Sequence, residues 1–266
     1  MAKEMTQNYY PLQDLLFRLG EPFRDLPALG RSALLALTAA LLPLTEESIL
    51  DFTLQDALRL MEDLPRHNSS QYINQESLTG DYFHAARRSL EDPFVYIVLS
   101  DTGSPASKLI SLVTRRRYNH VSLAFDESLA TMISYNGGGQ SAKPGLNQER
   151  LFDLRQKETS SVAVYRLASS RRQKEAILSR VEKINREGSS YNLSGLITKK
   201  SSLPNIMFCS QFVYSMLNEA GLNYFYKEST KVHPMDFLEL DAKNTLSFLC
   251  AYLIDKKPGL NQTAYV

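Results

Sequence analysis

Hydrophobic residues in the first quarter of the chain follow a helical pattern. Apolar positions recur three and four apart between residues 12 and 64, which is the spacing of one face of a helix. Thr45, followed by two glutamates, supplies a start signal for the second part of this stretch. The polar segment 65–70 contains proline, asparagine and serine, and such a composition is typical of a loop. We therefore expect residues 1–90 to form a helical N-terminal region, whose role the pattern does not indicate.

The pattern changes after Pro93. Residues 94–100 form a dense β-branched and aromatic run that ends in a turn-forming segment, as expected for a buried strand. Further strands are predicted over 120–125, 129–135, 162–167 and 246–254, and helices over 107–114, 170–187 and 209–220. Strands and helices alternate without a regular βαβ repeat, which favours an α+β fold around a mainly antiparallel sheet. Residues 91–266 are accordingly expected to form one domain.

One hexapeptide, Lys-Pro-Gly-Leu-Asn-Gln, occurs twice, at residues 143–148 and 257–262. Its proline and glycine predict two turn-forming segments. Two such short copies do not indicate a repeat architecture.

Composition limits the chemistry available to this protein. The 266 residues include 30 Lys and Arg against 29 Asp and Glu, for a net charge of +1. Because nucleic acids and anionic membranes are bound through clustered positive charge, we expect neither as a partner. The chain has two cysteines and four histidines, with no metal-site spacing and too few thiols for a disulfide framework. We expect no metal and no cofactor.

The chain start and its most apolar run indicate a cytoplasmic protein. Residues 1–10 are polar and mixed in charge, unlike the apolar core of a secretory signal. The most apolar run covers only residues 33–44, whereas about 20 residues are needed to cross a bilayer as a helix. We expect this run to be a buried helix, with association at a membrane as the alternative.

Cys209 lies at the predicted start of a helix whose apolar stripe includes Phe212, Val213 and Met216. The free amide groups and the positive end of the helix dipole at such a position stabilise a thiolate. The same amides can receive the oxyanion of a tetrahedral intermediate. The alternative is that Cys209 is simply a small buried residue, as Cys250 is within its predicted strand.

His120 begins a predicted strand and has a pKa range suited to general base and general acid work. By strand alternation His120, Ser122 and Ala124 share one face. A structural histidine is the alternative. Taken with Cys209, His120 completes the pair that a cysteine hydrolase needs.

The third polar group depends on the register of the hairpin that follows. If residues 126–128 form a three-residue loop, His120 lies opposite Ser134. A loop two residues longer places His120 opposite Asn136 instead. Both side chains share a strand face, and either could orient the imidazole.

These residues resemble the circularly permuted members of the NlpC-like branch of the papain-like cysteine hydrolases. The family's blocks occur in the order His120-Val121-Ser122-Leu123, Met132-Ile133-Ser134, Tyr191-Asn192 and Cys209-Ser210. The resemblance extends over about residues 92–240 and includes the segment 233–237. It does not cover residues 1–90.

The resemblance implies a permuted papain-like domain and assigns roles to individual residues. Cys209 is then the nucleophile, His120 the base and Ser134 the third group, with Tyr191 and Tyr118 beside the substrate. Two positions depart from the family pattern. Phe208 stands where the peptidoglycan peptidases commonly have aspartate, and Ser134 where histidine, glutamate or asparagine is more usual.

We therefore expect a thiol hydrolase that cleaves an amide, or an ester or thioester, through an acyl-enzyme on Cys209. Its partner would be a peptide, an amide or another small acyl-containing substrate. A non-catalytic binding module and an acyltransferase that uses a lipid or amine acceptor remain alternatives. The basic run Arg115-Arg116-Arg117 would select an acidic or phosphorylated substrate if it lies beside the cleft. His67 and His84 are expected to be solvated, and His233 to be structural.

Overall fold

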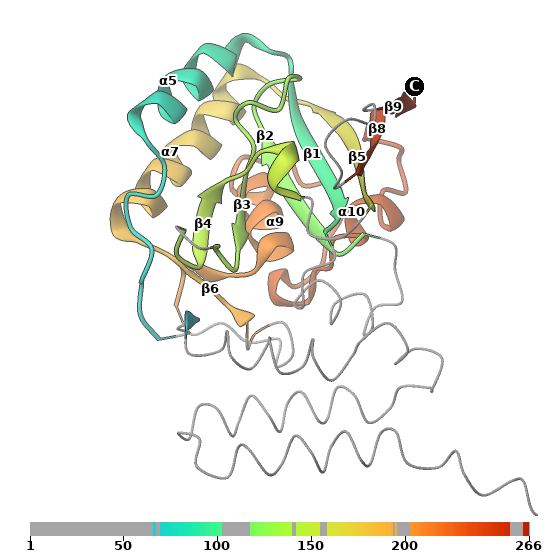
Figure 1. Cartoon of the computed structure of the whole chain (residues 1–266). Coiled ribbons are helices and arrows are strands. Elements are labelled where there is room, and N and C mark those ends of the chain that lie inside the picture. The colour runs from blue at the N-terminus through green and yellow to red at the C-terminus, as the bar shows by residue number, and fades with distance from the viewer. Residues whose placement is uncertain are drawn as a thin grey trace, which may run out of the picture.

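A computed structural model describes residues 66–67, 70–102, 118–139, 142–154, 159–193, 195, 203–255 and 263–265 (Figure 1). Several predictions fall outside these residues. They are the helical pattern of residues 12–64, the helix over 107–114, the basic run 115–117 and the second copy of the hexapeptide.

A seven-stranded antiparallel sheet organises the described chain. Its strand order is β4-β3-β2-β1-β5-β8-β9, and each neighbouring pair is antiparallel. The bounds are β1 Phe94–Asp101, β2 His120–Ala124, β3 Ile133–Asn136, β4 Gly145–Gln148, β5 Thr159–Ala168, β8 Ser247–Asp255 and β9 Thr263–Tyr265. The prediction of a mixed fold around a mainly antiparallel sheet is confirmed.

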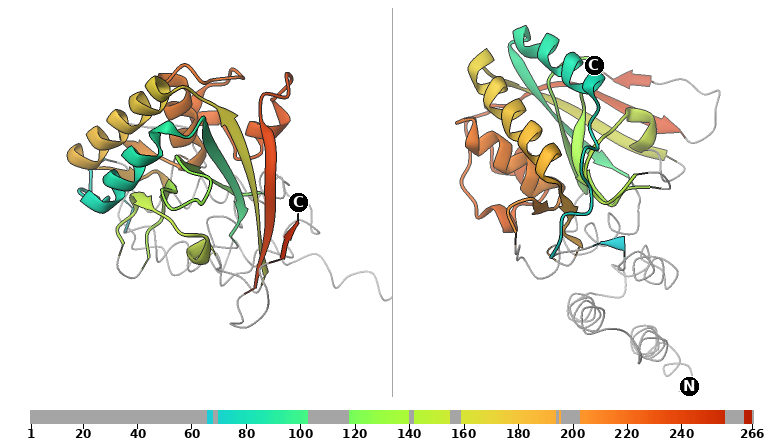
Figure 2. Two further views of the ribbon diagram at one scale, coloured as in Figure 1. Left: turned by 90° about the horizontal axis from the view of Figure 1, so that it is seen from above. Right: turned by 90° about the vertical axis from the view of Figure 1, so that its left-hand side faces the viewer.

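The described α-helices are α5 Gly80–Arg88, α7 Arg171–Glu187, α9 Cys209–Glu219 and α10 Asp236–Glu239. Three 3₁₀-helices, η2 Ser89–Glu91, η3 Leu151–Leu154 and η4 Ser229–Lys231, lie between them. Helix α7 begins with a capping box, in which Ser170 and Gln173 bond each other's backbone amides. Figure 2 shows α5 and α7 side by side on one side of the sheet. The helices predicted over 170–187 and 209–220 are confirmed to within a residue of each end.

Helix α9 packs against β2 and β3 and is fixed there by aromatic contacts. The rings of Tyr135 on β3 and Phe212 on α9 lie 5.0 Å apart between centroids. The Tyr135 hydroxyl donates a hydrogen bond of 3.2 Å to the carbonyl of Asn205, four residues before α9. These contacts hold the start of α9 close to the sheet.

Residues 70–90 belong to the same hydrophobic core as the sheet. Leu78, Tyr82, Ala86 and Leu90 are buried in the core cluster that also holds the α9 stripe. Asn74 forms an isolated antiparallel bridge with Ser189. A domain boundary at residue 90, as expected from the sequence, would therefore divide one core.

The turn between β2 and β3 sets the register of the two strands. The Asp126 carboxylate accepts hydrogen bonds from the amides of Ala130 and Thr131, at 3.0 and 2.9 Å. Leu129 adopts a positive φ of 59°. The strand therefore begins only at Ile133, which pairs with Leu123. Counting outward from that pair, His120 lies opposite Asn136.

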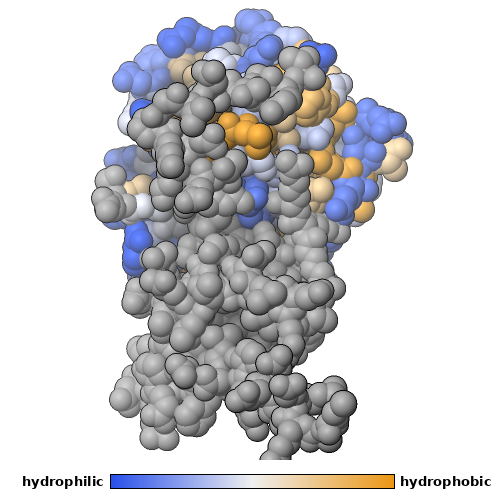
Figure 3. All heavy atoms as spheres, turned by 45° about the vertical axis from the view of Figure 1, so that its right-hand side comes forward, coloured by the Kyte–Doolittle hydropathy of each residue, from blue (hydrophilic) through white to orange (hydrophobic). Residues whose placement is uncertain are grey.

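The surface of the described chain is mixed in character. Large exposed hydrophobic side chains include Phe152 and, on β8, Phe248 and Leu253. In Figure 3 hydrophobic areas lie among hydrophilic ones on the described part of the face shown. In the same part of the chain, no helix combines the length and the apolar character required to cross a membrane.

Candidate active site

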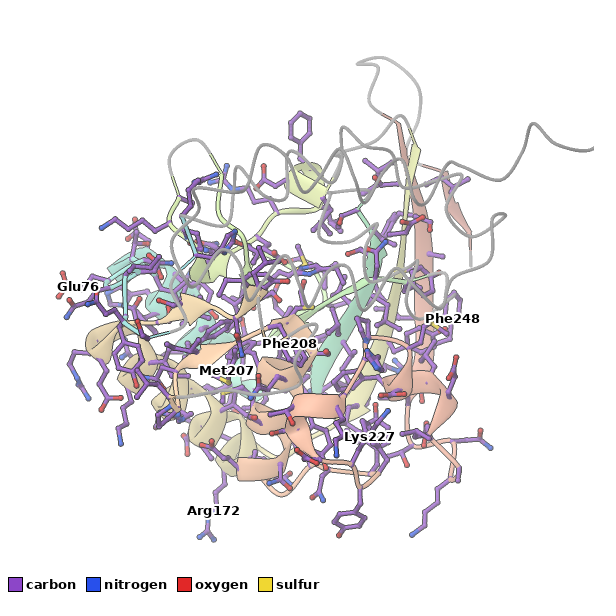
Figure 4. All side chains as sticks on the ribbon, turned by 90° about the horizontal axis from the view of Figure 1, so that it is seen from below. Glu76, Arg172, Met207, Phe208, Lys227 and Phe248 are labelled. Atoms are coloured by element: carbon purple, nitrogen blue, oxygen red, sulfur yellow. The ribbon has the colours of Figure 1, made fainter. Side chains whose placement is uncertain are left out.

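Cys209 is placed at the start of α9 by a short strand. β7 Ile206–Met207 leads into Phe208, whose extended backbone forms the N-cap of the helix. Met207 and Phe208 are labelled near the centre of Figure 4. Phe208 offers no side-chain hydrogen bond to the first turn, so the cap residue leaves the amides of that turn uncovered. Cys209 itself is buried, with 1% of its surface exposed.

Tyr191 is brought next to Cys209 by parallel pairing. β6 Ser190–Tyr191 pairs with β7, so that Tyr191 lies opposite Met207. The amide of Asn192 donates a hydrogen bond of 2.8 Å to the Met207 carbonyl. Burial, reinforced by the charges of Cys209 and Glu149, raises the pKa of Tyr191 well above its ordinary value. The phenol therefore keeps its proton and can act as a hydrogen-bond donor.

His120 forms a buried ion pair with Glu149. The Nε2 atom of His120 lies 3.0 Å from Oε1 and 3.1 Å from Oε2 of Glu149. Only 8% of His120 and 6% of Glu149 are exposed. Such a bond at one ring nitrogen fixes the orientation of the imidazole ring.

Glu149 is itself fixed by two polar side chains. It follows β4, and its amide donates a hydrogen bond of 2.8 Å to the Met132 carbonyl. The Ser122 hydroxyl donates to Oε2 at 2.6 Å, and the Asn136 amide donates to Oε1 at 2.7 Å. Each carboxylate oxygen therefore has a side-chain donor besides His120, which offsets the cost of burying the charge.

The electrostatics of this pair favour its charged form. Burial acts to lower the pKa of His120, but the charges of Glu149 and Cys209 raise it well above its ordinary value. Burial acts to raise the pKa of Glu149, but His120 and the bonds from Ser122 and Asn136 hold it below the ordinary value. An imidazolium facing a carboxylate is therefore the stable form at neutral pH.

Cys209 acts on the His120 ring through its charge and through side-chain hydrogen bonding, and both effects raise the pKa of His120. Because Glu149 occupies Nε2, Nδ1 is the ring nitrogen left for the thiol. The structure thus brings Cys209 and a carboxylate to the same imidazole, which is the arrangement that a nucleophile, a base and an orienting group require.

The expectation that Ser134 orients His120 is wrong. The Ser134 hydroxyl donates to the Val121 carbonyl at 2.7 Å, because the longer turn shifts the register by two residues. Asn136, the alternative, does lie opposite His120, but its amide bonds Glu149 rather than the imidazole. Glu149 takes the third position.

The other residues singled out from the sequence lie in different parts of the fold. Tyr118 is buried in the main hydrophobic core. His67, expected to be solvated, is half-buried, and its ring contacts Tyr191. His84 is exposed on α5, and the amide of His233 donates to the Asp236 carboxylate at 2.7 Å.

Glu149 was not predicted as a site residue, because the strand directly before it was not predicted. The first copy of the hexapeptide was expected to be a turn, but its residues 145–148 form β4, which pairs with β3. The available signal was an acidic residue directly after a strand that pairs with the β2–β3 hairpin, which carries His120. It becomes informative only once the pairing of β3 with β4 is known.

Comparison with protein-family models, with curated proteins and with solved structures finds no match for this chain. The geometry of the site therefore carries the functional argument.

Proposed function

We propose that the protein is a cysteine hydrolase that cleaves an amide bond through an acyl-enzyme on Cys209. The observation that carries the proposal is the buried series of Glu149, His120 and Cys209. The order of His120, Tyr191 and Cys209 along the chain, with the cysteine at the start of a helix packed on an antiparallel sheet, supports a permuted papain-like arrangement.

In the first half-reaction the Cys209 thiolate attacks the substrate carbonyl carbon, and a carbon–sulfur bond forms. The amides at the start of α9 and the Tyr191 hydroxyl then stabilise the oxyanion. His120, charged and held by Glu149, donates its proton to the leaving amine as the carbon–nitrogen bond breaks.

In the second half-reaction His120, now neutral, accepts a proton from water as the water oxygen attacks the thioester carbon. The carbon–sulfur bond breaks and the thiolate re-forms beside the imidazolium. Glu149 keeps its charge throughout and stabilises the imidazolium, as the carboxylate of a catalytic triad does.

The burial of Cys209 favours a second candidate with the same first half-reaction. If water is kept from the acyl-enzyme, an amine or a lipid hydroxyl takes its place as acceptor. Product analysis with and without an added amine separates the two. A free acid as the product at every amine concentration indicates hydrolysis, and an amide product indicates transfer.

The proposal is tested by trapping the acyl-enzyme on the full chain with 4-nitrophenyl acetate and locating the acetyl group by mass spectrometry. We expect acetylation at Cys209 and a loss of turnover of at least about 10³-fold in Cys209→Ala and His120→Gln. Cys250→Ala is the matched control, because its thiol lies in β8, and it should keep the wild-type rate.

Acetylation at Cys250, or acetylation of Cys209 that does not depend on His120, would contradict the proposal. A wild-type chain that is never acylated and turns over no ester or amide would instead favour a non-catalytic binding module.

A further inference from the structure

We propose that His67 is a positioning residue of this active site, which packs against the Tyr191 ring and holds the phenol in place against the acyl group. The inference rests on the proposed function, since the acyl group exists only if Cys209 is acylated. It extends the site to a residue far from the histidine and cysteine blocks in sequence.

The contact between the two rings is direct. The ring centroids of His67 and Tyr191 lie 5.5 Å apart, with 56° between the ring planes. This is the range in which aromatic rings attract each other. Tyr191 is in turn close enough to Cys209 and Glu149 for their charges to act on its hydroxyl. His67 therefore touches a residue that interacts with both the thiol and the carboxylate of the site.

The same imidazole also lies against the loop that follows β3. A Cβ atom added at Gly137 would lie 3.3 Å from Cε1 of His67, tighter than an ordinary contact. Gly137 directly follows Asn136, whose amide holds Glu149. The His67 ring thus lies against two parts of the site. One is Tyr191, and the other is the loop residue that follows Asn136, the partner of Glu149.

A neighbouring bond anchors this segment. The guanidinium of Arg66 donates a hydrogen bond of 2.8 Å to the carbonyl of Gly139, on the same loop. Residues 66 and 67 are therefore held against the loop at two points, by Arg66 at Gly139 and by His67 at Gly137.

The Tyr191 phenol must be held in place because its contribution to the rate depends on the orientation of its hydroxyl group. The Tyr191 backbone is fixed by β7, but its ring is free to tilt unless side chains confine it. A misplacement of about 1 Å in a catalytic group costs up to about 10²-fold in rate. Packing by His67 on one face of the ring supplies that confinement.

Kinetics of the full chain with 4-nitrophenyl acetate test the inference. We expect His67→Ala to lower kcat about tenfold with little change in KM, because Tyr191 acts on the transition state. His67→Phe should recover most of that rate, because it keeps a flat ring against Tyr191. His84→Ala on the exposed face of α5 is the matched control and should leave the rate unchanged.

An independent readout does not require turnover. The chain has only four histidines, so the proton NMR signals of their rings can be assigned by single substitutions. The Cε1 proton of His67 should move when Tyr191→Leu removes the aromatic ring, and should stay in place in Tyr191→Phe.

The outcomes separate this inference from the proposed function. Turnover that survives in Cys209→Ala overturns the proposed function and the inference that rests on it. If Cys209→Ala is inactive while His67→Ala keeps the wild-type kcat, the role of His67 alone is wrong. It is also wrong if His67→Phe is as slow as His67→Ala, or if Tyr191→Leu leaves the His67 signal unmoved.

Discussion

Two buried cationic side chains in this fold have different kinds of partner: backbone carbonyls for Lys174 and ionisable side chains for His120. Lys174 on α7 is fully buried. Its Nζ atom lies 2.5, 2.8, 2.9 and 2.9 Å from the backbone carbonyl oxygens of Ser89, Asp92, Phe94 and Phe125, among which it shares its three N–H groups. His120 is almost as buried, but its partners are the side chains of Glu149 and Cys209.

The difference lies in what the partners can do. Backbone carbonyls do not titrate, so Lys174 links α7 to η2 and to the strands β1 and β2 whatever the pH around neutrality. Burial lowers the pKa of Lys174 to about 8, and the ammonium still carries its charge at pH 7. The partners of His120 are ionisable side chains, and in the proposed mechanism Cys209 is the nucleophile while Glu149 keeps its charge. Burial of charge alone therefore does not mark a reactive site, whereas burial among titrating side chains does.

The largest expected effect concerns Lys174 rather than the candidate active site. Lys174→Met removes the buried ammonium that bonds these four backbone carbonyls, and we expect a loss of about 3–5 kcal/mol in the free energy of unfolding. Urea denaturation measures it, with Lys183→Met as the control, because Lys183 lies on the same helix with an exposed side chain. Equal stability of the two variants would refute a structural role for the buried ammonium.

The second effect concerns the site. Glu149→Gln removes the charge that raises the pKa of His120, and we expect kcat/KM to fall about 10- to 100-fold. The imidazolium then loses its proton at a lower pH, so the alkaline limb of the pH–rate profile moves to lower pH. Rates measured across pH check this, with the exposed Glu175→Gln on α7 as control. An alkaline limb that stays in place would show that Glu149 does not act on His120.

The smallest effects come from two buried serines and should have opposite signs. Ser100 lies opposite His120, and within the described residues its buried hydroxyl has no hydrogen-bond partner. Ser100→Ala should therefore raise the free energy of unfolding by about 1 kcal/mol, because an unsatisfied buried hydroxyl is costly. Ser134→Ala removes the bond to Val121 and should lower it by about 1 kcal/mol. Paired urea titrations measure both, and a shift of the same sign in each would contradict this assignment.

Much of the fold could be predicted because its signals are local. The β-branched run of β1, the amphipathic stripe of α7 and the helix start at Cys209 each depend on neighbours in sequence. The register of β2 and β3 could not be fixed, because the Asp126 carboxylate captures backbone amides and delays the next strand.

The site could be predicted only in part, for a related reason. Cys209 and His120 are single residues of rare types, and each lies at the start of an element. Glu149 is one of many acidic residues, and its role depends on the pairing of β4 with β3, where the proline and glycine of the hexapeptide had predicted a turn. His67 likewise reaches the site through a contact with Tyr191 that no local pattern encodes.

The rate of Cys209 alkylation by iodoacetamide at pH 7, followed by mass spectrometry, tests the central claim most directly. Because the charged His120 ring lies beside the thiol, we predict much faster alkylation of Cys209 in the wild-type chain than in His120→Gln. Equal rates of Cys209 alkylation in the two chains would contradict the proposed pairing of thiol and imidazole.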